Sequence, residues 1–175
     1  MKIDITTPAP SQTGTVNFLK TKTKAHLINN EWVAASSGAS IDSLDPATGD
    51  VLAAIASGDK ADVDAAVKAA RRALNDPSWA KMTPSQRGQL LWKMAELIEA
   101  NIDELAELET LDQGKPLYVG RWAEIPGAAE QFRYFAGLTT KVQGSTIPTS
   151  INYQPEGKQV FAYTRKEPIL SLIHI

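Results

Sequence analysis

The chain has 175 residues, of which 43% are hydrophobic and 22% charged, with a formal net charge of −2. This is ordinary globular composition, and it gives no broad positive field that would attract nucleic acid or an anionic membrane. No segment approaches the roughly 18 consecutive apolar residues of a membrane span. Because cysteine is absent, the chain has no disulfide, thiolate zinc ligand or thiol nucleophile. We expect a cytoplasmic α/β protein without a nucleic-acid or membrane partner.

The amino-terminal part predicts an arm followed by β-structure. Residues 1–24 are polar, which favours a mobile arm over a signal peptide or anchor. The segments expected after it are a hairpin over 26–33, a strand over 41–44, a turn over 45–49 and a strand over 51–56. Asn29 and Asn30 tolerate the positive φ that a tight hairpin needs. Together these segments would form a small β-meander.

Helical spacing of apolar residues begins after Gly58 and predicts helices up to residue 138. The first ends before Pro77, a helical pattern then runs from Thr83 to Gly114, and a last helix covers 117–138. Thr83 and Gln86 form a capping box, Pro84 suits the first helical position, and Gly114 is placed as a carboxy-terminal cap. Pro126 and Gly127 predict a kink in the last helix or a late start of it. Residues 141–148 and 159–166 are expected as strands joined by a loop.

The expected buried faces follow from the same spacing. We expect the four tryptophans, which are scattered along the chain, to anchor the core. The buried stripe of the helix after Thr83 and the buried face of the last helix are predicted to contain Leu90, Leu91, Met94, Leu97, Ile98, Phe132, Phe135 and Leu138.

A search for catalytic groups finds few candidates. Of the two histidines, His26 lies in a hairpin strand and His174 lies one residue from the end, and a structural role is favoured over a Ser-His-Asp arrangement for His26. No HExxH, GxSxG, Walker A or GxGxxG motif is present. Gly114–Lys115 is interpreted as a helix cap and not as a phosphate loop. The carboxylates at helical spacing are interpreted as a solvated helix face: Glu96, Glu99, Asp103, Glu104, Glu107 and Glu109.

Several strings in one order carry a family resemblance. They are LINNEWV, DPATGDVLAAIASGDKADVDAAVKAARRAL, SWAKMTPSQRGQLLWKMAELIEANIDELAELETLDQGKP, RYFAGLTTKVQGSTIP and AYTRKEP. Between Leu27 and Pro168 the chain resembles the opening third of the aldehyde dehydrogenase superfamily. Within it, the chain most resembles the phenylacetaldehyde and betaine-aldehyde type, which acts on small or aromatic aldehydes.

The resemblance implies an incomplete α/β fold. Residues 1–24 would be the arm and 25–140 the N-terminal part of a Rossmann-like NAD(P)-binding domain. Residues 141–168 would begin an oligomerisation β flap of a homo-oligomer, a dimer or a tetramer. After TRKEP the family continues with a Val-Gly-rich strand, whereas residues 169–175 are apolar and different, so we expect a non-family tail there.

The resemblance also implies the reaction of the full-length enzyme. A cysteine thiolate attacks the aldehyde, hydride passes to NAD or NADP, and a glutamate-activated water releases the carboxylic acid. These groups fall after the region that this chain covers, so no residue here is assigned to catalysis or to the cofactor, and no tight cofactor binding to this chain is expected. A structural monovalent cation would lie near Leu44 and Asp112, although Asp112 could equally be a polar residue at a helix end. Ala123 and Gly127 would line the aldehyde tunnel and leave room for a bulky aldehyde.

Three functional readings remain open from the sequence. The chain is an inactive fragment of such an enzyme, a non-catalytic interaction module that binds intact dehydrogenase subunits, or a degenerate relic. Because the parallel sheet that the helices should cover is missing, we expect a partly ordered helical core with frayed β segments when the chain is alone.

Overall fold

The computed structural model describes residues 18–19, 23–149 and 157–168. The expected arm over most of residues 1–24 and the expected tail over 169–175 lie outside these residues. The β-elements are β1 (Thr23–Lys24), β2 (His26–Ile28), β3 (Glu31–Val33), β4 (Ser40–Leu44), β5 (Val51–Ala56), β6 (Thr146–Ile147) and β7 (Ala162–Tyr163). The helices are α2 (Lys60–Asn75), α3 (Pro77–Ala80), α4 (Pro84–Ala100), α5 (Ile102–Gln113), α6 (Leu117–Val119) and α7 (Ile125–Leu138), with a π-helical segment (Gly120–Glu124) before α7.

The amino-terminal strands form two small units. β5 is the central strand of a three-stranded sheet, paired in parallel with β1 and antiparallel with β4, and the register shifts between Ser43 and Leu44. β2 and β3 form a separate antiparallel hairpin. Its turn residues Asn29 and Asn30 have φ of 55° and 62°, which is the left-handed conformation that the sequence predicted. Residues 23–24, assigned from the sequence to the arm, form β1.

The helix boundaries follow the capping residues. Thr83 accepts from the backbone N–H of Gln86, and the Gln86 side chain accepts from the Thr83 N–H, which confirms the predicted capping box of α4. Gly114 ends α5 with a left-handed φ of 73°, as expected for a carboxy-terminal cap. The helical pattern after Thr83 is divided at Asn101, whose φ of −117° and ψ of 25° separate α4 from α5.

The last helical region shows the predicted late start, because α7 begins at Ile125, after α6 and a π-helical segment. The irregularity lies in the π-helical segment, directly before Pro126, and Pro126 occupies the first turn of α7. Proline has no N–H to donate and crowds the carbonyl four residues earlier, which for Pro126 belongs to Trp122. The turn before Pro126 therefore widens into the π-helical segment. π-Helical turns are a recognised cause of such irregularities in helices.

The buried apolar residues of the described chain are all alanines: Ala35, Ala56, Ala69, Ala95, Ala106, Ala129 and Ala136. The expected buried faces are wrong in part, because Leu90, Met94, Leu97 and Phe135 are each about half exposed. The expectation that the tryptophans anchor the core is also wrong. Trp32, Trp79, Trp92 and Trp122 are 71%, 39%, 49% and 65% exposed.

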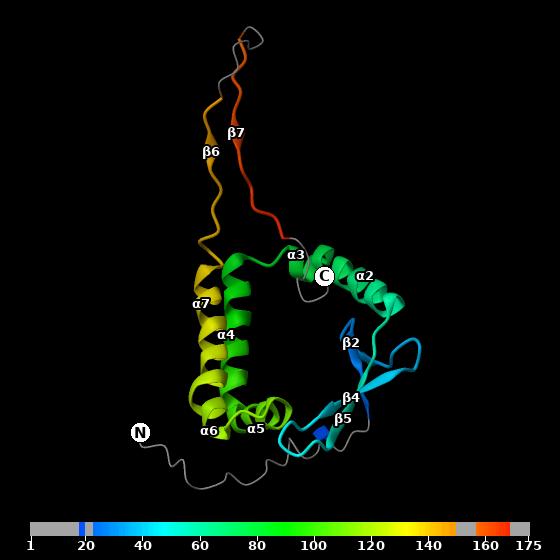
Figure 1. Cartoon of the computed structure of the whole chain (residues 1–175). Helices are drawn as coiled ribbons and strands as arrows, with labels where there is room; N and C mark the ends of the chain where they lie inside the picture. The colour runs from blue at the N-terminus through cyan, green and yellow to red at the C-terminus, as the bar shows by residue number, and fades with distance from the viewer. Residues whose placement is uncertain (1–17, 20–22, 150–156, 169–175) are drawn as a thin grey trace.

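α4 and α7 lie side by side and form the most extensive contact between elements (Figure 1). A Cβ on Gly88 of α4 would lie 3.0 Å from the carbonyl oxygen of Ala136 on α7, so the two backbones approach closely. Arg133 of α7 donates to Glu99 of α4 at 2.6 Å, and its guanidinium lies 5.5 Å from the centroid of the Trp92 ring. The hydrogen bond to Glu99 raises the pKa of Arg133 above its ordinary value, so this link stays charged.

The β6–β7 pair extends away from the helical body (Figure 1). Thr146 pairs with Tyr163 and Ile147 with Ala162 in antiparallel register. The predicted strands over 141–148 and 159–166 are thus much shorter than expected. A two-stranded pair without a third strand or a covering helix is marginal, which accounts for the short pairing.

The α4–α7 contact predicts opposite effects for two glycine-to-alanine substitutions. Gly88→Ala should lower the local opening free energy of α4 and α7 by about 1–3 kcal/mol, because the added methyl meets backbone that cannot move freely. Gly137→Ala is the matched control, because its Cβ meets nothing within 4 Å, and it should raise that free energy by about 0.5–1 kcal/mol. Amide hydrogen exchange of the two helices measures both. Equal effects of the two substitutions would contradict the close packing at Gly88.

Candidate functional site

The turn over 45–49 joins β4 to β5 beside the carboxyl end of α5. The Gly49 N–H donates to the Asp45 carbonyl at 2.7 Å, and the Ala47 N–H donates to the Asp45 carboxylate at 2.7 Å. Gly49 has φ of 80°, the left-handed conformation that favours glycine. A Cβ on Gly114 would lie 2.9 Å from Cγ of Pro46. The turn therefore packs directly against the cap of α5.

The structure places the two residues of the expected cation site near each other. The Ser43 hydroxyl donates to Oδ1 of Asp112 at 2.7 Å. Leu44 follows Ser43 at the register shift of β4, and Asp112 is the penultimate residue of α5. Leu44 and Asp112 are both exposed. Neither the hydrogen bond nor the packing of the turn on α5 was foreseen from the sequence.

A cavity of about 400 Å³ lies between the three-stranded sheet and α5. The residues lining it are Phe18, Leu19, Lys24, Ser43, Leu52, Ala53, Ile55, Leu108, Glu109, Leu111, Asp112 and Gln113. Glu109 binds Lys115 through Oε1 at 2.9 Å, and its Oε2 is buried without a hydrogen-bond partner. The hydrogen bond to Glu109 raises the pKa of Lys115. In the part of the chain that the structure describes, no three His, Cys, Asp or Glu residues are grouped to hold a metal ion.

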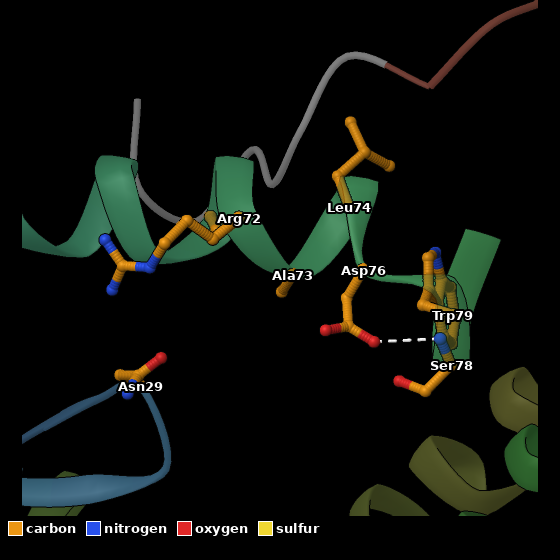
Figure 2. A pocket seen from close by; sticks show the side chains of 8 residues that line it. Asn29, Arg72, Ala73, Leu74, Asp76, Ser78 and Trp79 are labelled. Carbon is orange, nitrogen blue, oxygen red and sulfur yellow. Dashed lines mark hydrogen bonds between the residues drawn. The ribbon is translucent and has the colours of Figure 1, made fainter.

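A second, more open cavity of about 610 Å³ lies between the β2–β3 turn and the α2–α3 junction (Figure 2). It is lined by Asn29, Ala70, Arg72, Ala73, Leu74, Asp76, Ser78 and Trp79. Asp76 accepts from the backbone N–H of Ser78 at 2.8 Å and so caps α3. The side-chain hydrogen bond from Ser78, followed by this backbone hydrogen bond, lowers the pKa of Asp76. This carboxylate is therefore committed to a helix end, and the described residues that line the cavity include no histidine that could act as a base.

A serine, a histidine and an aspartate do meet at the amino end of α2. His26 Nε2 lies 4.0 Å from Oδ2 of Asp62. The Ser36 hydroxyl donates to Asp59 at 3.0 Å and to Asp62 at 3.3 Å. An activated serine would instead donate to the imidazole, so this arrangement does not activate a nucleophile. His174 lies outside the described residues.

Four of the carboxylates predicted to form a solvated face of α4 and α5 are ion-paired: Glu96, Glu99, Asp103 and Glu109. Lys93 binds Glu96 at 3.0 Å, Arg121 binds Asp103 at 2.5 Å, and Arg133 binds Glu99 at 2.5 Å. Such exposed pairs stabilise a protein only weakly. They account for these carboxylates without a catalytic role.

The π-helical segment and the start of α7 hold the two residues expected to line the aldehyde tunnel, Ala123 and Gly127. Glu124, the last residue of the segment, binds Lys115 at 3.4 Å. Because Lys115 directly follows the cap residue Gly114, this ion pair ties the segment to the end of α5. Ala123 lies within the segment and Gly127 in the first turn of α7. A Cβ on Gly127 would meet nothing within 4 Å. The position therefore has open space in front of it.

The packing of the turn on the α5 cap predicts unequal effects at two glycines. Gly49→Ala and Gly114→Ala both place a Cβ at positive φ, which costs about 1–2 kcal/mol. Only Gly114→Ala also brings the new Cβ against Pro46, so it should lower the local stability by about 1–3 kcal/mol more than Gly49→Ala does. Amide hydrogen exchange over 40–50 and 105–116 measures the local loss of stability. Gly49→Ala is the control, and an equal loss in both variants would argue against the Pro46 contact.

The described helices include none that is long and apolar enough to cross a membrane. Within the described residues, no complete set of nucleophile, base and oxyanion donor comes together.

Comparison with known proteins places the chain in a family. Residues 32–175 match the model of the aldehyde dehydrogenase family. The match includes residues 169–175, so a non-family tail stays a prediction only. The chain is 44% identical over 148 residues to aldehyde dehydrogenase 1 of Tanacetum cinerariifolium, and 41% identical over 143 residues to phenylacetaldehyde dehydrogenase of Pseudomonas fluorescens. These matches cover 85% and 82% of this chain, and 28% of each relative.

A solved structure gives the same result for the fold. The chain superposes on the NAD+ complex of an aldehyde dehydrogenase from Bacillus cereus with a TM-score of 0.79 and 43% sequence identity, over 90% of this chain and 30% of that one. The predicted α/β fold, an incomplete N-terminal part of the aldehyde dehydrogenase fold, is therefore confirmed. The chain spans less than a third of these relatives, and it belongs to the aldehyde dehydrogenase family.

Proposed function

We propose that this chain is the N-terminal part of an NAD(P)-dependent aldehyde dehydrogenase, which oxidises an aldehyde to a carboxylic acid when complete. The observation that carries the proposal is the superposition of 90% of the chain on an aldehyde dehydrogenase solved with NAD+. When bound, NAD or NADP would accept the hydride that is removed from the aldehyde.

The residues of this chain do not by themselves form the cofactor site. The only parallel pairing among the described strands is the two-residue contact of β1 with β5. A dinucleotide site needs a glycine-rich turn between a strand and a helix of a parallel sheet, and no such unit occurs in the described residues. NAD or NADP is therefore assigned to the complete enzyme, and no step of the reaction is assigned to residues of this chain.

The nucleophile must likewise come from outside this chain. The family reaction begins with attack of a cysteine thiolate on the aldehyde carbonyl, and the 175 residues contain no cysteine. We infer that the chain by itself is inactive. Its part in the enzyme is to supply the helices and strands against which the catalytic regions pack.

We place the aldehyde beside the π-helical segment and the start of α7. The small side chains of Ala123 and Gly127 and the open space in front of Gly127 support a site that accepts bulky aldehydes. The 41% identity to a phenylacetaldehyde dehydrogenase is consistent with an aromatic substrate, and the betaine-aldehyde type is the alternative. We also place the complete enzyme in the cytoplasm, as the composition suggested.

We further propose that the β6–β7 pair contributes to a homo-oligomer, a dimer or a tetramer. The pair extends away from the helices (Figure 1), and exposed apolar side chains lie along it: Val142, Ile147, Val160, Phe161 and Tyr163. A two-stranded unit with free edges is stabilised when further strands pair with it. Strands of the same enzyme, in the same or another subunit, are suited to that role.

A second candidate function is a non-catalytic binding module for intact dehydrogenase subunits. The exposed apolar residues on α4 and α7, including Leu90, Trp92, Leu97 and Phe135, favour it because apolar surface of this extent normally contacts another part of a protein. A binding module would bind intact dehydrogenase subunits, but it would not restore activity in the chimera described below. A degenerate relic would neither bind these subunits nor restore activity.

Completing the chain tests the proposed activity. The chain alone should form no NADH or NADPH from an aldehyde. A chimera that continues after residue 168 with the corresponding remainder of the Bacillus cereus enzyme should form one of them, and should turn over phenylacetaldehyde faster than acetaldehyde. The control is the same chimera with the nucleophilic cysteine of the appended part replaced by serine.

Two outcomes would contradict the proposal. Reduction of the cofactor by the chain alone would place the chemistry within these residues. A chimera that folds but is inactive would show that the chain does not supply the N-terminal part of the enzyme. Equal turnover of the two aldehydes would reject the substrate assignment alone.

We also propose that Leu44 and Asp112 hold a monovalent cation, through the backbone carbonyl of Leu44 and the carboxylate of Asp112. The hydrogen bond between Ser43 and Asp112 supports this, because it fixes the carboxylate beside the end of β4. One carboxylate together with neutral oxygens suits a singly charged cation, whereas Ca²⁺ sites commonly use several carboxylates.

Salt substitution tests the cation site. Amide protection over 40–50 and 105–116 should be higher in potassium or sodium chloride than in tetramethylammonium chloride at the same ionic strength, because the larger cation does not fit between the two oxygens. Asp112→Asn should remove the difference. Asp42→Asn, an exposed carboxylate on β4, is the control and should retain it. Identical protection in all three salts would reject the site.

A further inference from the structure

The β2–β3 hairpin is connected to the helices through the amino end of α2. His26 lies on β2 and faces Gly58 and Asp62, and a Cβ on Gly58 would lie 3.3 Å from Cε1 of the His26 ring. The imidazole is therefore held closely between the hairpin and the first turn of α2. Its side chain is 24% exposed, so solvent can reach part of the ring.

Asp62 is the one buried charged residue among those described, with 8% of its surface exposed. Oδ1 accepts from the Ser36 N–H at 3.0 Å, and Oδ2 accepts from the Asp59 N–H at 3.0 Å and the Ser36 hydroxyl at 3.3 Å. The hydrogen bond from the Asp59 backbone is the largest cause of the lowered pKa of Asp62. The carboxylate is consequently ionised throughout the pH range in which histidines titrate.

His26 Nε2 is buried and has no hydrogen-bond partner. It lies 4.0 Å from Oδ2 of Asp62, one small movement beyond hydrogen-bonding distance. Neutral imidazole carries a proton on only one nitrogen, whereas the imidazolium donates from both. A buried polar nitrogen without a partner is unfavourable, and protonation of the ring would give it the nearby carboxylate as an acceptor.

The elements next to the ring carry carboxylates and a cation. From α2 the carboxylates are Asp62 and the capping residue Asp59, which Ser36 joins to it. On β3 the titratable group is Glu31, two residues from Val33, which pairs with His26. The cation is Lys60 in the first turn of α2, and it is paired with Asp64 at 2.6 Å.

We propose that His26 is a pH-responsive latch between the β2–β3 hairpin and α2. Below the range in which histidine titrates, the ring takes a proton from solvent, and Nε2–H donates to Asp62 and tightens the junction. Above that range the ring is neutral and loses the charge attraction to Asp62, so the junction opens more often. The latch is independent of the proposed enzyme function, because it uses none of the groups assigned to the cation or the aldehyde.

Amide hydrogen exchange of the whole chain tests the latch at the two amides that donate to Asp62, those of Ser36 and Asp59. After correction for the intrinsic exchange rate, their protection should be about two- to fivefold higher near pH 5.5 than near pH 8, the range that a partly exposed ion pair supplies. His26→Gln should give equal protection at both pH values, because its amide donates whatever the pH. His174→Gln, the other histidine of the chain, is the control and should keep the pH dependence.

The proposal is overturned if the parent chain shows no change with pH, or if His26→Gln keeps it. Protection of α4 and α7 in the same experiment shows whether each variant retains its helices. Should His26→Gln disturb the hairpin, Asp62→Asn provides the second test, since Asp59 remains the N-cap of α2 and the asparagine oxygen can still accept a hydrogen bond from the capping box. Loss of the pH dependence in Asp62→Asn supports the latch, and its persistence excludes Asp62 as the acceptor and rejects the proposal.

Discussion

The close approach of α4 and α7 through small residues is the constraint on which the rest of the helical structure depends. Gly88 leaves no room for a Cβ against Ala136, and Ala95 and Ala129 are fully buried. Small residues let two helix backbones come closer than large side chains allow, and the contact is reinforced by the Arg133–Glu99 ion pair. Because alanine and glycine fill the closest part of this contact, several large apolar side chains of both helices are left exposed, among them Leu90, Trp92 and Phe135.

The exposed apolar side chains of α4 and α7 are consistent with the proposal that this chain is part of an enzyme but holds none of its catalytic residues. Exposed apolar surface of the kind found on α4 and α7 normally contacts another part of a protein, and the chain matches only 30% of a solved aldehyde dehydrogenase. The turn over 45–49 is tied to α5 through Pro46 and Gly114. The described residues thus suit the proposed role of a scaffold, in which the thiol and the cofactor turn belong to the remainder of the enzyme.

Local features of the fold could be predicted from the sequence, and features that depend on distant contacts could not. The capping box at Thr83, the hairpin at Asn29 and the cap at Gly114 each depend on a few neighbouring residues, so they were predicted at the residue. Helical periodicity finds an apolar face, but it does not say whether the partner of that face belongs to the same chain, which is why Trp92 is exposed. The hydrogen bond from Ser43 to Asp112 joins residues 69 positions apart, and no local pattern specifies it.

If the proposed scaffold needs the rest of the enzyme to cover its large apolar side chains, the chain alone should unfold without cooperativity. Thermal unfolding of the chain, followed by far-UV circular dichroism, measures this. A substantial helical signal should be lost gradually over a broad temperature range, because a core of alanines buries too little apolar surface for cooperative unfolding. A single sharp transition would instead show that the chain is a complete folding unit and would rule out the incomplete scaffold.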